Sequence, residues 1–175
     1  RDPRDICISW ARHDNISNND SLKFMFNDSA CIKWIGHDNY QQYDKNIPVY
    51  ISSWEKHVRS WINLKVKCPY LLLSYEDLVY DKINTIDKII KFFEKNYNIQ
   101  ISNKNIKVKN IIKSTSFNVL QEMENKEGFI ESVNEQFFAV GKKEQWKTQL
   151  DGSQIKLIEN KFKNLMQKFN YKALN

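Results

Sequence analysis

The stretch from residue 69 to residue 97 limits the possible folds of this chain more than any other feature. Its first part, Tyr70–Ser74, has the sequence YLLLS, and such a short, continuously apolar run predicts a strand buried on both faces in a parallel sheet. Apolar side chains then recur every three or four residues, at Ile83, Ile86, Ile90, Phe93 and Tyr97. This spacing predicts an amphipathic helix that packs back on the strand, as in α/β folds.

Most of the remaining chain is predicted to be helical, because four glycines and three prolines in 175 residues leave few positions for turns. Asp2 and Asp151 are the expected caps of the first and last helices. Periodicity predicts helices over 2–13, 22–36, 48–61, 105–113, 116–125 and 151–169, with polar loops at 14–20 and 126–143. One strand cannot make a sheet, so we expect the other strands of a truncated parallel sheet to lie before Arg1 or in another chain.

The sequence shows no internal repeat or low-complexity linker, so residues 1–175 are expected to form one unit. The chain begins at Arg1 without a leader, and we expect it to be the later, partial region of a larger domain. No apolar stretch approaches the roughly 18 residues of a membrane helix. Cys7, Cys31 and Cys68 are odd in number and far apart, which excludes a disulfide framework and a CxxC metal pair. The first two are expected on apolar helix faces, and unpaired thiols indicate a reducing, cytoplasmic compartment.

The net charge of +6, from 27 basic and 21 acidic residues, comes almost entirely from lysine. Arginine occurs at only four positions, and the lysines are scattered along predicted helix faces among Asp and Glu. A surface that binds nucleic acid would be expected to cluster its basic residues, with arginine prominent among them. The charge therefore indicates a solvated helix surface and no nucleic-acid partner.

The sequence opens with RDPRD, which places an arginine just before a helix capped by Asp2. The guanidinium of Arg1, the hydroxyl of Ser9 and the free N–H groups at the helix start can together hold a phosphate. The alternative is that Arg1 forms a surface ion pair with Asp2 and that Ser9 takes no part in binding.

Three further segments carry candidate ligand-binding side chains. Tyr75 directly follows the predicted strand, where ligands bind in open α/β sheets, and it is placed to contact a base or ribose; the alternative is a core tyrosine. Thr115 and Phe117 offer a hydroxyl and a flat aromatic face for an adenine ring, and a helix cap would have the same sequence. The third segment is a glycine-bearing basic loop that can close on a phosphate: Gly141, Lys142 and Lys143.

The sequence offers no catalytic constellation. The histidines His13, His37 and His57 lack the spacing of a metal site, and none precedes a Ser or Cys in a hydrolase motif. No pair of acidic residues stands out as a general acid and base. The residues alone therefore indicate binding of phosphate and an aromatic ring, with no metal and no catalytic group in this chain.

Taken in order, these motifs resemble the sulfotransferase family that uses 3′-phosphoadenosine 5′-phosphosulfate, over nearly the whole chain. RDPRDICIS resembles the family's 3′-phosphate loop and helix, and SWEKHVRSW followed by PYLLLSYEDL resembles its helix-to-strand stretch. STSFNVLQEMEN is similar to its adenine segment, and VGKKEQWKTQL to its late glycine-lysine loop. The resemblance implies an α/β, P-loop-like sulfotransferase fold, of which this chain would be the helix-rich C-terminal part.

The resemblance also implies a role for each candidate residue. The 3′-phosphate would be bound by Arg1 and Ser9. The adenine would be surrounded by Tyr75, Thr115 and Phe117, and the phosphate would be covered again by Gly141, Lys142 and Lys143. The family usually has an Arg-Lys pair where this chain has Ala139 and Val140. Our hypothesis is that the two lysines after the glycine supply that charge.

By the same resemblance, the whole protein would transfer a sulfuryl group from this co-substrate to an acceptor hydroxyl or amine, without a metal. The family's lysine-bearing loop for the 5′-phosphosulfate and its catalytic histidine lie before the RDPRD-like motif, so the 175-residue chain would be inactive alone. No motif indicates the class of acceptor. Two other interpretations stay open: a nucleotide-binding phosphotransferase of related fold, and a non-catalytic remnant or helical interaction module that binds a partner chain.

Overall fold

The computed structural model describes residues 1–33, 48–64, 68–129, 132 and 136–174. Contacts between residues divide the chain into two compact units. Unit 1 comprises Arg1 and Lys65–Lys143, and unit 2 comprises Asp2–Leu64 and Glu144–Asn175. None of the described helices combines the length and apolar character needed to cross a membrane.

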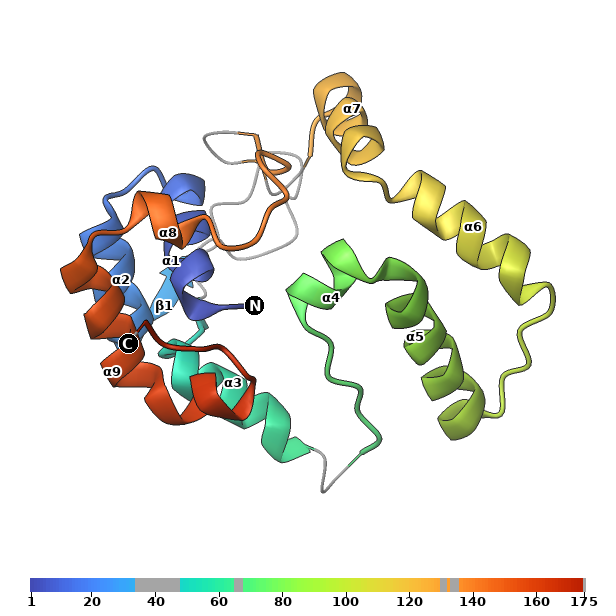
Figure 1. The fold of residues 1–175 in the computed structure, drawn as a ribbon, viewed down its shortest axis with the longest axis horizontal. Helices are drawn as coiled ribbons and strands as arrows, with labels where there is room; N and C mark the ends of the chain where they lie inside the picture. Colours follow the sequence, from blue (N-terminus) through green and yellow to red (C-terminus); the bar gives the residue numbers. More distant parts are fainter. Residues whose placement is uncertain (34–47, 65–67, 130–131, 133–135, 175) are drawn as a thin grey trace. The chain divides into compact units, whose positions relative to one another are not determined.

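Unit 2 is built from five helices and a short strand pair of the described chain (Figure 1). The elements are α1 (Pro3–His13), α2 (Asn18–Phe26), β1 (Cys31–Lys33), β2 (Pro48–Tyr50), α3 (Trp54–Asn63), α8 (Trp146–Gln149) and α9 (Gly152–Lys168). Asp2 caps α1, with Pro3 in its first turn, and Asp151 and Gln154 form a reciprocal capping box at the start of α9. Both predicted caps are confirmed.

The core of unit 2 lies where α1 and α2 pack on α9. Phe162 is 1% exposed, and its ring centroid lies 4.9 Å from that of Trp54 and 5.3 Å from that of Phe26. The predicted stripe of α9 is buried at Ile155, Ile158, Phe162 and Leu165. Cys7 is a buried core residue, as expected.

Two predicted boundaries in unit 2 are wrong. The helix expected from residue 22 begins at Asn18, because Ser17 accepts a hydrogen bond from the Asp20 backbone N–H and caps it within the predicted loop. The same helix ends at Phe26, where Asn27 Oδ1 accepts from Ser29 N at 2.9 Å and starts a turn. The predicted helix end near residue 36 lies outside the described residues.

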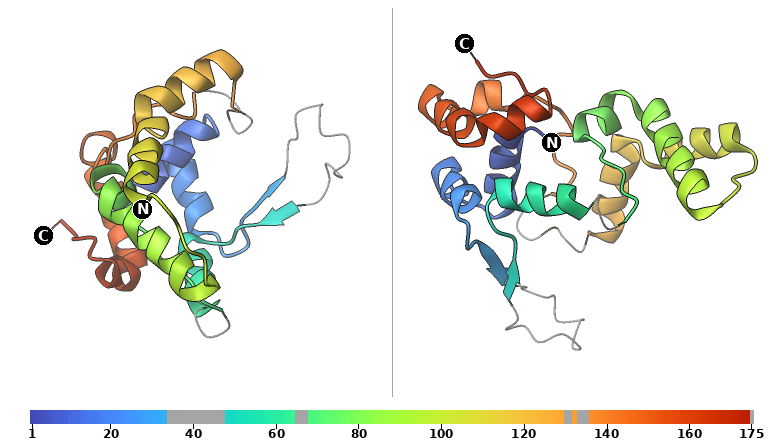
Figure 2. Two further views of the ribbon diagram at one scale, coloured as in Figure 1. Left: turned by 90° about the vertical axis from the view of Figure 1, so that its right-hand side faces the viewer. Right: turned by 90° about the horizontal axis from the view of Figure 1, so that it is seen from below.

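An antiparallel strand pair replaces parts of two predicted helices. Cys31 pairs with Tyr50, and Ile32 with Val49, in the ribbon of β1 and β2 that Figure 2 shows side by side. Cys31 is therefore on an exposed strand and not on an apolar helix face. The helix expected after Pro48 begins only at Trp54, because Ser53 accepts from Lys56 N and caps it. Its two tryptophans differ in environment, since Trp54 is 9% exposed and Trp61 is 60% exposed.

Unit 1 contains four helices in the described chain: α4 (Tyr75–Tyr80), α5 (Lys82–Tyr97), α6 (Lys104–Ser114) and α7 (Phe117–Glu127). The three longer ones confirm the predicted helices, and α5 and α6 pack on each other as a helical hairpin (Figure 1). On α5, Ile86 and Ile90 are buried, whereas Ile83, Phe93 and Tyr97 are exposed. The apolar stripe is therefore only partly covered.

The predicted strand Tyr70–Ser74 does not form a strand. Its backbone has no neighbour in a sheet among the described residues, and Leu72 is 55% exposed. A strand is defined by hydrogen bonds to an adjacent strand, and an apolar sequence cannot supply these by itself. The described sheet is the antiparallel pair of unit 2, so the expected parallel sheet is not seen in this part of the chain.

Candidate functional site

Three of the predicted binding residues meet in unit 1. The guanidinium carbon of Arg1 lies 4.3 Å from the centroid of the Tyr75 ring, and Arg1 Nη2 donates to the carbonyl oxygen of Lys142 at 3.4 Å. Tyr75 is the first residue of α4, whose start is capped by Ser74 accepting from Asp77 N at 2.9 Å. The cap and the stacking hold the cation against an aromatic face beside the glycine-bearing loop.

Gly141 and Phe117, predicted from separate motifs, are in direct contact. Gly141 has a φ of +63°, and a Cβ at this position would lie 2.4 Å from Phe117 Cδ2. Only glycine satisfies both the backbone conformation and this close approach. The aromatic face at the start of α7 and the basic loop therefore form one surface in unit 1.

Lys143 and Thr115 contact two side chains that were not predicted as part of the site, those of Tyr80 and Lys82. Lys143 Nζ lies 4.4 Å from the centroid of the Tyr80 ring, and Lys143 N donates to Tyr80 Oη at 3.4 Å. Lys82 Nζ donates to the Thr115 carbonyl at 2.7 Å, while Thr115 Oγ1 donates to Ile111 O at 2.7 Å. The hydroxyl of Thr115 thus serves the end of α6 in this structure.

Ser9 is the one predicted site residue that belongs to unit 2, where it is half-buried on α1. Its proposed role toward phosphate stays a prediction.

The second arginine of RDPRD has a structural role in unit 2. Arg4 is 2% exposed, and its guanidinium pairs with Asp2 at 2.7 Å and with Glu159 at 2.5 Å while it lies 3.7 Å from the centroid of the Trp146 ring. Burial lowers the pKa of Arg4, but the hydrogen bonds and charges of the two carboxylates outweigh it and raise the pKa. Asp2 is therefore a partner of Arg4 as well as the cap of α1.

Asp5, also from RDPRD, fixes the chain directly after the basic loop. This carboxylate is 1% exposed and accepts from Glu144 N at 2.7 Å and from Trp146 N at 3.1 Å. Glu144 has a φ of +60°, which a non-glycine residue adopts at a cost that such bonds offset. All three residues belong to unit 2.

One face of α7 holds the segment that precedes the basic loop. Gln121 Nε2 donates to Phe138 O at 3.0 Å, and Glu124 accepts from Phe137 N at 2.6 Å, from Phe138 N at 2.9 Å and from the hydroxyl of Ser132. Neither polar residue was predicted as functional. Their spacing of four and seven residues from Phe117 could have identified them, because it places all three on one helix face.

The Glu124 carboxylate is 8% exposed. Desolvation raises the pKa of this carboxyl, but the hydrogen bonds from Ser132, Phe138 and Phe137 outweigh it, so the pKa is lowered from its ordinary value. The native contacts therefore favour the charged form of Glu124, which strengthens its bonds to the two backbone N–H groups.

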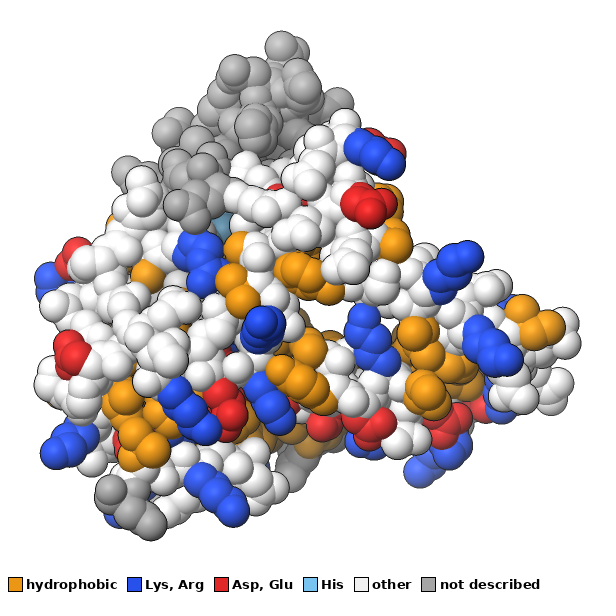
Figure 3. All heavy atoms as spheres, turned by 45° about the horizontal axis from the view of Figure 1, so that its top comes forward, with side chains coloured by type: hydrophobic (Ala, Val, Ile, Leu, Met, Phe, Trp, Pro, Cys, Tyr) orange, Lys and Arg blue, Asp and Glu red, His pale blue; other side chains and the backbone are white. Residues whose placement is uncertain are grey.

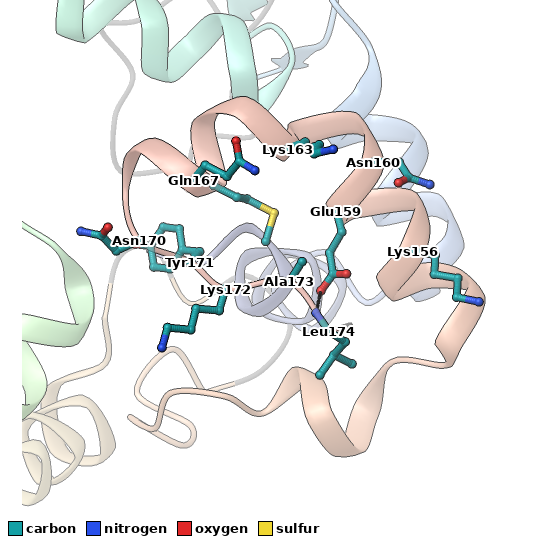
Figure 4. Close-up of a pocket in the computed structure, with 11 residues that line it drawn as sticks. Lys156, Glu159, Asn160, Lys163, Gln167, Asn170, Tyr171, Lys172, Ala173 and Leu174 are labelled. Carbon is teal, nitrogen blue, oxygen red and sulfur yellow. Dashed lines mark hydrogen bonds between the residues drawn. The ribbon is translucent and has the colours of Figure 1, made fainter.

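A separate hollow of about 580 Å³ lies in unit 2 between α9 and the C-terminal residues (Figure 4). Its lining includes Lys156, Lys163 and Lys172, while Glu159 at its base accepts from Leu174 N at 3.1 Å. None of the predicted binding residues lines it. On the face drawn in Figure 3, Lys and Arg side chains are spread among acidic and apolar ones.

The described residues contain no group of three or more His, Cys, Asp or Glu side chains that could hold a metal ion. The geometry around Arg1, Tyr75 and the Gly141 loop instead offers a fixed cation and an aromatic face beside a glycine-bearing loop. These groups suit a phosphate ester that carries an aromatic ring.

Comparison with known proteins gives one consistent result. The family model described as the sulfotransferase domain matches residues 1–170. Sulfotransferase 2A6 of Mus musculus is 31% identical over 100 residues, which are 55% of this chain and 30% of that protein. Sulfotransferase 1B1 of Canis lupus familiaris is 37% identical over 70 residues, which are 40% of this chain and 22% of that protein.

A solved structure shares the fold. The crystal structure of mouse sulfotransferase SULT7A1 complexed with PAP superposes with a TM-score of 0.66 and 18% sequence identity. The match covers 97% of this chain and 57% of that one. The described chain thus has the helix-rich part of a P-loop-like sulfotransferase fold, and it spans less than two thirds of each of these proteins.

Proposed function

Because the chain belongs to the sulfotransferase domain family, we propose that the protein transfers a sulfuryl group from 3′-phosphoadenosine 5′-phosphosulfate to an acceptor hydroxyl or amine. In this reaction the acceptor atom bonds to sulfur while the bond from sulfur to the 5′-phosphate oxygen breaks. The acceptor proton passes to a base, and adenosine 3′,5′-bisphosphate leaves. The chain described here supplies the binding of the donor nucleotide.

The contact of Arg1 with Tyr75 and Lys142 is the observation that carries this proposal. It joins the first and last motifs of the chain in one unit, although 141 residues separate Arg1 from Lys142. A guanidinium over an aromatic ring combines a cation with a planar fork of donors, the group that forms two charge-assisted bonds to a phosphate. Family membership favours sulfuryl transfer over the phosphotransferase interpretation.

We assign the residues as follows. The 3′-phosphate is bound by Arg1 and Ser9 and covered by the loop of Gly141, Lys142 and Lys143. The adenine lies against Tyr75 and Phe117, with Thr115 beside it. No metal is required, because the cations of the site neutralise the phosphate charge. We further propose a cytoplasmic, partial sulfotransferase domain that is inactive as the 175-residue chain, because its sequence offers no candidate for the catalytic base.

The test is a comparison of two nucleotides by calorimetry on the 175-residue chain. Adenosine 3′,5′-bisphosphate is expected to bind at least about tenfold more tightly than 5′-AMP, because only it offers the 3′-phosphate to Arg1. Equal affinities would refute the assigned roles of Arg1 and Ser9. Turnover of the sulfated nucleotide by the purified chain would refute its proposed inactivity.

The interpretation as a helical interaction module predicts a different result. It requires that neither nucleotide shifts the thermal unfolding of the chain and that the chain pairs or aggregates through its exposed apolar side chains. Sedimentation of the free chain, measured beside the nucleotide titrations, separates the two interpretations.

A further inference from the structure

The face of α7 that carries Phe117, Gln121 and Glu124 runs along the segment that leads into the basic loop. Phe117 contacts Gly141, Gln121 binds the Phe138 carbonyl, and Glu124 binds the N–H groups of Phe137 and Phe138. The contacts follow each other in reverse order along the two segments. The helix therefore determines where the loop starts and how far it extends before Gly141.

Glu124 makes the strongest of these contacts. It is a charged acceptor for two consecutive backbone N–H groups and for the Ser132 hydroxyl, and it is 8% exposed. Hydrogen bonds to a shielded carboxylate are stronger than those between neutral groups. The rings of Phe129, Phe137 and Phe138 pack together next to it, with centroids 4.8 to 5.3 Å apart.

We propose that Glu124 is a positioning residue for the nucleotide site, acting through the backbone of residues 137–138 on the loop of Gly141, Lys142 and Lys143. Glu124 does not touch the nucleotide. It fixes the loop so that Gly141 stays against Phe117 and the carbonyl of Lys142 stays within reach of Arg1. This inference rests on the proposed function for the identity of the ligand, but its structural part does not.

Removal of the Glu124 charge distinguishes a positioning role from a direct electrostatic effect on the nucleotide, because the two predict opposite changes in affinity. Glu124→Gln raises the net charge by one, which by itself would favour an anionic nucleotide. The replacement also sets an amide group against two N–H donors, so at least one of the three bonds is lost. We expect the affinity for adenosine 3′,5′-bisphosphate to fall about tenfold, and the affinity for 5′-AMP to fall less, because the loop is assigned to the 3′-phosphate.

Glu122→Gln is the matched control. Glu122 lies on the same helix, is exposed, and undergoes the same change in charge and shape. We expect it to leave both affinities unchanged or slightly higher. An equal loss in both variants, or an unchanged preference for the 3′-phosphate in Glu124→Gln, would overturn the proposal.

Amide hydrogen exchange without nucleotide tests the structural part directly. Glu124→Gln should accelerate exchange at Phe137, Phe138 and Gly141, while exchange in α9 should stay as in the wild type. If the variant is poorly folded, Gln121→Met provides the second test, because it removes the bonds of Gln121 to the Phe138 carbonyl and to Gln136 Oε1 without changing the charge. Unchanged loop exchange in both variants refutes the positioning role, whereas failure of the wild type to bind nucleotide refutes only the proposed function.

Discussion

The two units differ in how their helices begin and in what those helices bury. In unit 2, side-chain caps start α1, α2, α3 and α9, from Asp2, Ser17, Ser53 and Asp151. In unit 1, Ser74 caps α4, whereas α5, α6 and α7 have no side-chain cap bond among the described contacts. Four of the five described helices of unit 2 are thus fixed locally at their starts, whereas α8 in unit 2 and α5, α6 and α7 in unit 1 depend on other contacts.

The two units also differ in how many apolar side chains they bury. Apart from Ile86 and Ile90 on α5, the fully buried apolar side chains of the described chain all belong to unit 2. All the predicted binding residues except Ser9 belong to unit 1, where large apolar side chains such as Leu72, Ile83 and Ile106 are more than half exposed. The comparison indicates that unit 2 holds most of the folding free energy, whereas unit 1 holds most of the residues proposed to bind the nucleotide.

The largest effect is expected from removal of a core ring. Phe162→Ala in unit 2 should lower the free energy of unfolding by about 3 to 5 kcal/mol, because it leaves a cavity beside Trp54. Phe93→Ala in unit 1 removes the same atoms from a ring that is 43% exposed, and should cost less than about 1 kcal/mol. Urea unfolding followed by far-ultraviolet circular dichroism measures both changes. Similar losses in the two variants would contradict the division of stability.

The two arginines of RDPRD give the next comparison. Arg4→Met should destabilise the chain by about 3 kcal/mol, because it leaves the carboxylates of Asp2 and Glu159 buried without their cation. Arg1→Met should change stability by less than about 0.5 kcal/mol but abolish the preference for adenosine 3′,5′-bisphosphate over 5′-AMP. Unfolding curves and calorimetry on both variants check this. A stable Arg4 variant, or an Arg1 variant that retains the preference, would break the comparison.

Two glycines of unit 1 test whether packing against Phe117 is required for the proposed nucleotide binding. Gly141→Ala should weaken binding of adenosine 3′,5′-bisphosphate about tenfold or more, because the new methyl group collides with Phe117 in a left-handed backbone. Gly128→Ala is the control, since Gly128 has a φ of +73° but nothing within 4 Å of the added Cβ. Gly128→Ala should introduce the same kind of backbone strain but leave the affinity for adenosine 3′,5′-bisphosphate unchanged. Equal affinities of the two variants, measured by calorimetry, would show that the contact with Phe117 is not required.

Several local features of the fold were predicted from the sequence because neighbouring residues determine them. The caps at Asp2 and Asp151 and the helices α5, α6 and α7 follow from short-range patterns, and all are present. The strand at Tyr70–Ser74 was predicted from apolar composition, yet it forms only when another strand supplies hydrogen bonds. The antiparallel pair of β1 and β2 was missed for the same reason, since its paired residues lie 15 to 19 positions apart in the sequence.

The residues of the candidate site were also only partly predicted from the sequence. Gly141 and Phe117 were each predicted from local chemistry, but their contact depends on how α7 lies against the loop. Glu124 was missed because its spacing from Phe117 indicates a shared helix face, whereas its burial depends on residues 137 and 138. Arg4 was missed because its partner Glu159 is 155 residues away. The sequence indicated the residue types proposed to bind the nucleotide, whereas the residues proposed to position them are identified only from tertiary contacts.

The smallest expected effect is the pH dependence of the cap of α9. Hydrogen bonds from Ser153 and from Gln154 N lower the pKa of Asp151. Since the pKa is lower in the folded state than in the unfolded state, ionised Asp151 stabilises unit 2 above the ordinary aspartate range of about pH 4. This contribution is lost as the pH falls through the lowered native pKa.

Tryptophan fluorescence reports this loss for unit 2 alone, because all five tryptophans fall within its sequence ranges. Asp151→Asn retains an acceptor for the cap but does not titrate, so the difference in stability from the wild type should shrink as the pH is lowered from 7 to 3. Gln154→Met breaks the other half of the capping box without removing a charge, and its difference should stay constant over that range. If the stability of both variants changes with pH in parallel with that of the wild type, protonation of Asp151 is not coupled to the stability of unit 2. The side-chain cap of α9 would then contribute no measurable charge-dependent stability that distinguishes it from the uncapped helices.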